Sequence, residues 1–97
     1  MKINIEVEQT VNKEIELETP AYYTDEFRNY LITEDAVLQI GGTLAIFWTK
    51  EKHSGQYYKQ ISEILDESKP STKEVFDKAY NDFLLKINEI TLTKELV

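Results

Sequence analysis

Apolar and polar residues alternate along the first 18 positions of the chain. In the segment KINIEVE the odd positions Ile3, Ile5 and Val7 are apolar, and in VNKEIELE the odd positions Ile15 and Leu17 are apolar. A period of two is typical of a half-buried β-strand. The two segments therefore predict an antiparallel hairpin with its apolar residues on one face.

The two apolar sets must lie on the same face of the hairpin. Both sets occupy odd positions and paired residues face the same side, so the numbers of two paired residues must add up to an even number. This rule excludes a two-residue loop and favours a three-residue loop over residues 9–11, which pairs Ile5 with Ile15 and Glu6 with Glu14. Like charges directly opposed on a sheet are destabilising. The predicted register therefore needs water or a partner to tolerate the opposed glutamates.

Three further strand patterns follow Pro20. FRNYLI and AVLQI predict a hairpin that turns at residues 33–35, and TLAIFW predicts another strand after Gly41 and Gly42. Glycine reaches positive φ without steric cost, so the glycine pair is typical of a two-residue hairpin loop. A phosphate-binding loop would be followed by a helix. Since a strand pattern follows, we interpret the glycine pair as a turn.

After Trp48 the period changes to that of a helix. Apolar residues from Tyr57 to Leu65 predict a helix over about residues 55–66. STKE forms a capping box with Ser71 as the N-cap, and the apolar stripe after it predicts a second helix over about residues 72–89. The tail ITLTKELV is compatible with a short strand or a frayed end.

Strands followed by helices, without βαβ alternation, predict an α+β fold. We expect an antiparallel meander of four to five strands over about residues 2–49, with the two helices packed on one face. The chain of 97 residues is too short for two cores, so it predicts a single domain over residues 1–97. A composition of 41% hydrophobic and 30% charged residues is typical of a globular protein.

The composition excludes several classes of function. The absence of cysteine excludes a disulfide framework, thiolate chemistry, zinc fingers and iron–sulfur clusters. The longest apolar run, LAIFW, is too short to span a bilayer, and the first residues lack the apolar block of a secretory signal. We therefore expect a cytoplasmic protein.

The negative charge is concentrated near the N-terminus. The formal net charge is −7, and the first 26 residues hold seven carboxylates against two lysines, a net charge of −5. Nucleic-acid binding requires basic residues that replace the counterions of the phosphates, and anionic membranes repel an acidic chain. We therefore expect neither a nucleic acid nor a membrane as the partner.

No motif indicates an enzyme. His53 is the only histidine, and the lysines beside Glu51 would repel a cation from it, so we expect no metal and no cofactor. We interpret His53 as a solvated loop residue. Adjacent acids lie at predicted turns or helix ends, where neighbouring side chains usually point apart: Asp25 with Glu26, Glu34 with Asp35, and Asp66 with Glu67. We therefore expect no catalytic residue.

The acidic strands are the candidate partner-binding surface, together with two tyrosines, since tyrosine is enriched in interfaces. The residues are Glu6, Glu8, Glu14, Glu16, Glu18, Tyr22 and Tyr23. One interpretation is a solvated face, screened over about 8 Å at physiological salt, that keeps the hairpin soluble. The other is a docking surface for a basic protein. A further alternative is a structural component that forms homo-oligomers through a sheet edge or an exposed apolar helix surface.

Two segments, TPAYY…YLITEDAVLQI and STKEVFDKAYNDFLLKI, resemble small uncharacterised accessory proteins of bacterial phages and mobile elements. The resemblance covers about half of the chain and contains no functional motif. It implies a bacterial or phage setting, in which some such proteins bind and inhibit host machinery. It implies no catalytic residue.

Overall fold

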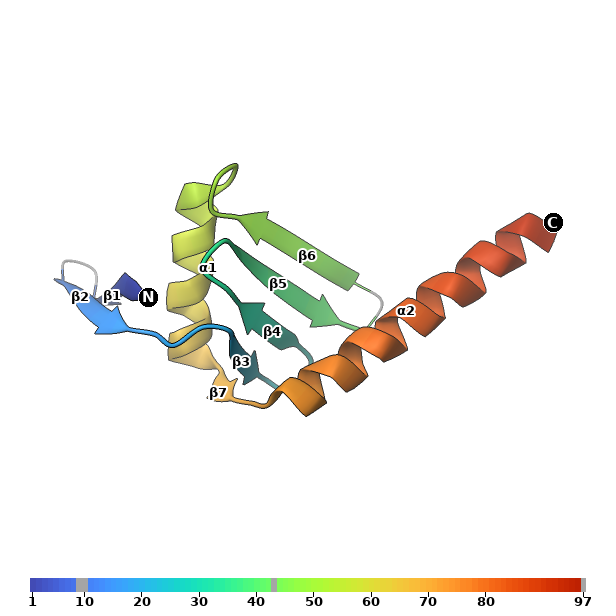
Figure 1. Cartoon of the computed structure of the whole chain (residues 1–97), viewed down its shortest axis with the longest axis horizontal. Helices are drawn as coiled ribbons and strands as arrows, with labels where there is room; N and C mark the ends of the chain where they lie inside the picture. Colours follow the sequence, from blue (N-terminus) through green and yellow to red (C-terminus); the bar gives the residue numbers. More distant parts are fainter. Residues whose placement is uncertain (9–10, 43, 97) are drawn as a thin grey trace.

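The computed structural model describes the backbone of residues 1–8, 11–42 and 44–96, and the side chains of residues 1–3, 14–42 and 44–89. The N-terminal strands β1 (Lys2–Glu8) and β2 (Val11–Glu16) form a two-stranded sheet of their own. The second sheet has the strand order β6-β5-β4-β3-β7 (Figure 1), and its members are β3 (Ala21–Thr24), β4 (Asn29–Ile32), β5 (Ala36–Gly41), β6 (Leu44–Thr49) and β7 (Lys69–Pro70). Helix α1 (Ser54–Glu67) lies between β6 and β7, and α2 (Lys73–Leu96) ends the chain.

These elements confirm the predicted α+β class. Strands β3 to β6 form an antiparallel meander in which each strand pairs with the next, and the two helices pack on the sheet. Both helices begin within one residue of the predicted start, and the undecided tail continues α2 as far as Leu96. Within the described residues, no helix is long and apolar enough to cross a membrane.

The sheet contains two strands that the hydrophobic pattern did not predict. The sequence of β3 is AYYT, in which two adjacent tyrosines interrupt any alternation. Strand β7 has only two residues, and it pairs with β3 because α1 returns the chain to that edge. Neither segment is long enough to display a period, so tertiary contacts decide both.

The register of the N-terminal hairpin differs from the prediction. Glu14 lies opposite Asn4 rather than opposite Glu6, and Ile15 lies opposite Ile3. The predicted pairing of two glutamates is therefore wrong, because the register from Lys2 to Glu6 is shifted by two residues. The shared apolar face is kept, since a shift of two positions does not turn a strand over.

The loop of this hairpin also differs. Val11 belongs to β2, so two residues separate the strands instead of the predicted three, and both lie outside the described residues. A bulge between Glu6 and Glu8 breaks the regular pairing at the end of β1. An extra residue on one strand changes the parity of the pairing, so the even-number rule does not extend past the bulge.

The turn between β5 and β6 confirms the predicted hairpin with a shift of one residue. Gly41 is the last residue of β5 and pairs with Leu44, so the loop contains Gly42 and the undescribed residue 43. Gly42 has a φ of 62°, in the left-handed region that glycine adopts readily. The assignment of both glycines to the loop is therefore wrong.

Helix α2 is capped one residue later than predicted. The Oγ1 atom of Thr72 accepts a hydrogen bond from the Val75 amide at 3.3 Å, as an N-cap side chain does. The amide of Ser71 instead donates to the carbonyl of Tyr22 at 2.8 Å and extends the contact between β7 and β3. Thr72, not Ser71, is therefore the capping residue.

The two helices cover opposite faces of the five-stranded sheet, which corrects the expectation of one shared face. Tyr57 of α1 belongs to a buried cluster with Ile32 of β4. Phe76 of α2 packs against Tyr22, with ring centroids 5.8 Å apart. Tyr22 pairs with Leu31, whose side chain points to the face opposite that of Ile32 because side chains alternate along a strand. Each face of the sheet therefore has its apolar residues covered by one helix.

The N-terminal hairpin contributes its apolar face to the core under α1. The side chains of Ile3 and Leu17 are 1% and 8% exposed, and both belong to the cluster around Tyr57. The hydroxyl of Tyr57 donates to the Thr33 carbonyl at 2.6 Å, which ties α1 to the end of β4. The hairpin is thus fixed to the rest of the molecule by burial on one side.

Candidate functional site

The structure places the predicted acidic residues on the solvent side of the hairpin wherever their side chains are described. Glu14, Glu16 and Glu18 are exposed, and Leu17 between them is buried. Glu16 also pairs with the N-terminal amine at 3.0 Å, although 63% of its side chain stays exposed. The side chains of Glu6 and Glu8 lie outside the described residues. We define Glu14, Glu16 and Glu18 as the acidic strip.

The two predicted tyrosines do not extend the acidic strip. Tyr22 and Tyr23 are adjacent on β3, so their side chains point to opposite faces of the sheet, and both are half-buried. Tyr22 contacts Phe76 of α2, whereas Tyr23 packs against the core under α1. Most of each ring therefore serves the fold.

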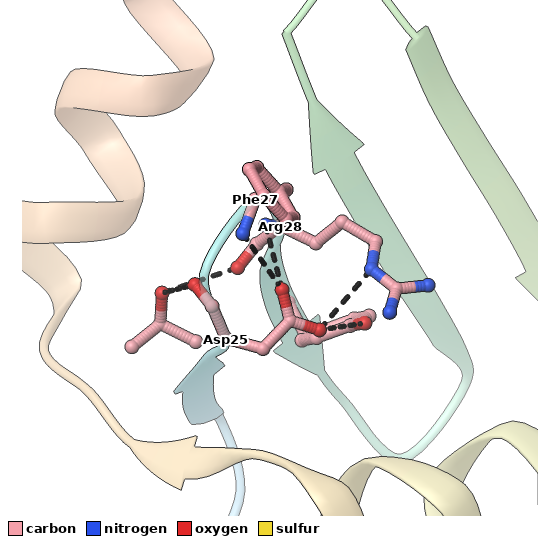
Figure 2. Close-up of polar contacts among 5 residues, drawn as sticks. Asp25, Phe27 and Arg28 are labelled. Carbon is pink, nitrogen blue, oxygen red and sulfur yellow. Dashed lines mark hydrogen bonds and ion pairs between the residues drawn. The ribbon is translucent and has the colours of Figure 1, made fainter.

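A second site, which the sequence did not single out, lies at the turn between β3 and β4. Figure 2 shows the carboxylate of Asp25 at its centre. One carboxylate oxygen, Oδ1, accepts hydrogen bonds from the amides of Phe27 and Arg28 at 3.0 and 2.9 Å. The other, Oδ2, accepts from Arg28 Nε at 3.1 Å and from the Tyr30 hydroxyl at 2.9 Å. We call residues 25–28 with Tyr30 the Asp25 turn.

The electrostatics of this turn keep Asp25 ionised. Partial burial opposes ionisation, but the hydrogen bonds from Phe27, Tyr30 and Arg28 and the guanidinium charge outweigh it, so the pKa of Asp25 lies below its usual value. Burial and the carboxylate of Asp25 raise the pKa of Tyr30 to about 12. A carboxylate that already accepts four hydrogen bonds is a poor general base. The arrangement therefore serves to hold the turn in shape.

The rigid turn presents one large apolar side chain to solvent. Phe27 is 81% exposed. Beside it lies an open depression of about 670 Å³, lined by residues 24–28 together with Glu67 and Lys69. The lining combines the carboxylates of Asp25, Glu26 and Glu67 with the cationic side chains of Arg28 and Lys69. The depression is therefore an open, charged surface beside an exposed aromatic ring.

His53 lies away from both sites, in the connector before α1. Its Nδ1 accepts a hydrogen bond from the Thr49 amide at 3.4 Å, and its own amide donates to the Thr49 carbonyl at 2.8 Å. No group of three or more potential metal ligands occurs within the part of the chain that the structure describes. His53 therefore has a visible structural role at the end of β6.

The sequence carries a partial signal for the Asp25 turn. Aspartate is common at the first position of a turn because its side chain bonds to the amides two and three residues ahead, as the pair Asp25 and Glu26 suggested. The bond from Tyr30 has no such signal, because it depends on how β4 folds back on β3. The pattern FRNYLI predicted a strand from Phe27, but β4 begins at Asn29, so the position of Phe27 in the turn was predicted wrongly.

Comparisons with protein families, with curated proteins and with solved structures find no match to this chain.

Proposed function

We propose that the protein is a non-enzymatic binding protein whose N-terminal hairpin contacts a basic surface of another protein. The observation that carries the proposal is the acidic strip. Glu14, Glu16 and Glu18 project into solvent at alternate positions while Leu17 anchors the same segment in the core. Three carboxylates are thereby held on one side of a fixed strand.

The charge distribution supports steering of a basic partner. Residues 1–18, which contain the hairpin, hold five glutamates against two lysines, a net charge of −3 of the total of −7, so negative charge is concentrated around the hairpin. Complementary charge accelerates association and selects against acidic competitors. The hairpin therefore supports recognition of a lysine- or arginine-rich surface.

The observed register reduces the charge repulsion around the acidic strip. Glu14 lies opposite Asn4, and Glu16 lies opposite Lys2, so neither of these glutamates is directly opposed by another. Directly opposed like charges would destabilise the sheet. The strip can therefore persist in the free protein and be available to a partner.

The resemblance to phage accessory proteins suggests inhibition of host machinery as the setting of this contact. In that setting the partner would be a host protein that uses a basic surface for its own function. An acidic strip would compete for that surface.

The test is binding to a lysine-rich peptide, measured by fluorescence anisotropy, with a glutamate-rich peptide of equal length as the negative probe. We expect binding of the lysine-rich peptide at about 0.01 M salt and its loss at about 1 M, where the Debye length falls from about 30 Å to about 3 Å. The double variant Glu14→Lys, Glu18→Lys should abolish binding.

A matched control separates the strip from the total charge. The double variant Glu51→Lys, Glu63→Lys changes two other exposed glutamates and gives the same net charge. We expect this control to bind nearly as well as the wild type. Equal loss of binding in both double variants, or no binding of the wild type at low salt, would contradict the proposal.

A further inference from the structure

The five-stranded sheet ends at β6 on one side and at the two-residue strand β7 on the other, so β6 is its long edge. The strand order places β6 at the border of the sheet, and Figure 1 shows its outer side with no strand beside it. We infer that β6 of a second copy of this chain pairs antiparallel with this edge and joins two five-stranded sheets into one. The inference is independent of the contact proposed for the acidic strip.

The direction of the main-chain groups along β6 shows which of them are free to pair. The amide of Lys50 donates to the Asp35 carbonyl at 2.7 Å, toward β5, whereas the amide and carbonyl of Thr49 point outward and are taken by His53. Main-chain direction alternates from one residue to the next in an antiparallel ladder. The N–H and C=O groups of Ala45 and Phe47 therefore point outward as well, and no described strand pairs with them.

Strand β6 lacks the features that usually protect a sheet edge. Natural edges are blunted by lysine, by proline, by bulges or by very short strands. The six residues LAIFWT contain no charge and no proline, and their pairing with β5 is regular throughout. An edge of this kind is a template for another strand.

A two-fold axis fixes how two copies can pair. Paired residues must face the same side of the sheet, so their numbers must add up to an even number. A register centred on Ile46 pairs Ala45 with Phe47 of the second copy and Phe47 with its Ala45. Each of these pairs exchanges two hydrogen bonds. All the free main-chain groups of Ala45 and Phe47 are then used, and Thr49 keeps its bonds to His53.

An alternative register, centred on Phe47, would form fewer main-chain hydrogen bonds along the edge. It would pair Ala45 with Thr49 of the second copy, and the main-chain groups of Thr49 are already bonded to His53. Only the central pair would then form its hydrogen bonds. The structure therefore favours the register centred on Ile46.

The side chains along the edge complement one another in this register. Leu44 is 56% exposed and Phe47 is 57% exposed, and they lie on opposite faces of the sheet. Pairing places Leu44 beside Trp48 of the second copy on the face covered by α1. It places Phe47 beside Ala45, which is also exposed, on the other face. Both faces of the seam thus bury apolar surface.

The test is the molar mass of the full chain, measured by light scattering from micromolar to millimolar concentration. We expect a monomer of 11.4 kDa to convert to a dimer of twice that mass as concentration rises. A mass of 11.4 kDa at every concentration would overturn the inference.

Two substitutions of Ala45 test whether main-chain hydrogen bonds of β6 hold the dimer together. Ala45→Pro removes an outward N–H and leaves the ladder to β5 intact, so we expect the dimer dissociation constant to rise roughly tenfold or more. Ala45→Ser keeps the N–H and should dimerise like the wild type. Circular dichroism verifies folding. A folded Ala45→Pro variant with unchanged dimerisation would overturn the edge as the interface.

A cysteine substitution tests the register, because the chain has no cysteine of its own. In Ile46→Cys the two sulfurs would meet across a pair whose Cα atoms are about 4.5 Å apart, within the range of a disulfide. We expect rapid oxidation to a covalent dimer. Phe47→Cys should cross-link much more slowly. Slow cross-linking of Ile46→Cys, or preferential cross-linking of Phe47→Cys, would overturn the register.

Discussion

The acidic strip and the Asp25 turn both place carboxylates near the surface, but the two regions use them in opposite ways. Asp25 accepts four hydrogen bonds from its own chain, and its side chain is only 18% exposed. Glu14 and Glu18 are exposed. The same chemical group therefore shapes the fold in one region and stays open to solvent in the other.

This difference shows which carboxylates a partner could use. Binding to Asp25 would require the partner to displace Arg28 and Tyr30 and to break the turn. The acidic strip requires displacement of water and of the N-terminal amine at Glu16 only. Sequence position alone does not distinguish a carboxylate bonded within the chain from one open to a partner, because both segments contain acidic residues. The hydrogen-bond partners of each carboxylate separate them.

The largest effect is expected at the anchor of the acidic strip. Ile3 is 1% exposed and packs in the cluster under α1, so Ile3→Ala should lower the free energy of unfolding by about 3 kcal/mol. Urea unfolding measures this loss. Hydrogen exchange should show β1 and β2 losing more protection than β4 and β5. A loss below about 1 kcal/mol would indicate that the hairpin is not anchored by this contact.

The second-largest effect on stability is expected at Asp25, whose carboxylate holds the turn in shape. Asp25→Ala removes hydrogen bonds to a charged group, so we expect the free energy of unfolding to fall by about 2 kcal/mol. Glu26→Ala changes the adjacent, exposed carboxylate and should alter stability by less than about 0.5 kcal/mol. Similar effects of the two substitutions would remove the distinction between the regions.

The pH dependence of stability should carry the signature of Asp25. Its pKa is lower in the folded protein, so the unfolded chain takes up the proton first as the pH falls. The stabilisation is complete above the unfolded pKa of about 3.9, and it is lost as the pH falls through the folded pKa. Urea unfolding should show a larger loss on acidification in the wild type than in Asp25→Asn. Equal losses would argue against a charged carboxylate in the turn.

The smallest effect on stability is expected in the acidic strip itself. Glu14→Gln and Glu18→Gln remove charge without removing a described hydrogen bond or buried contact, so the free energy of unfolding should change by less than about 0.5 kcal/mol each. Thermal unfolding measures the change. A stabilisation well above that value would mean that repulsion within the strip is larger than the register suggests.

The sequence predicted those parts of the fold that have a clear period. The alternation of Ile3, Ile15 and Leu17 gave the apolar face of the hairpin, and the helical stripe before Leu65 gave α1. Strand β7 could not be predicted, since two residues have no period and pair only where α1 delivers them. The register of the hairpin could not be predicted either, because no residue type marks the bulge in β1 that shifts it.

The candidate sites were predictable to different degrees. The exposure of Glu14 and Glu18 follows from alternation with buried Leu17, which is a local property. The role of Asp25 depends on Tyr30, which reaches it only after β4 has paired with β3. Local patterns therefore reveal which residues face water, whereas the tertiary structure decides which of them are already occupied.

Chemical-shift mapping can compare the two regions in a single titration. A lysine-rich peptide is added to the isotope-labelled protein, and the amide resonances are followed by two-dimensional NMR at low salt. If the partner contact is at the acidic strip, we expect shifts at residues 14–18 and little change at residues 25–30. Shifts concentrated at the Asp25 turn, or no shift in either region, would contradict the proposed contact.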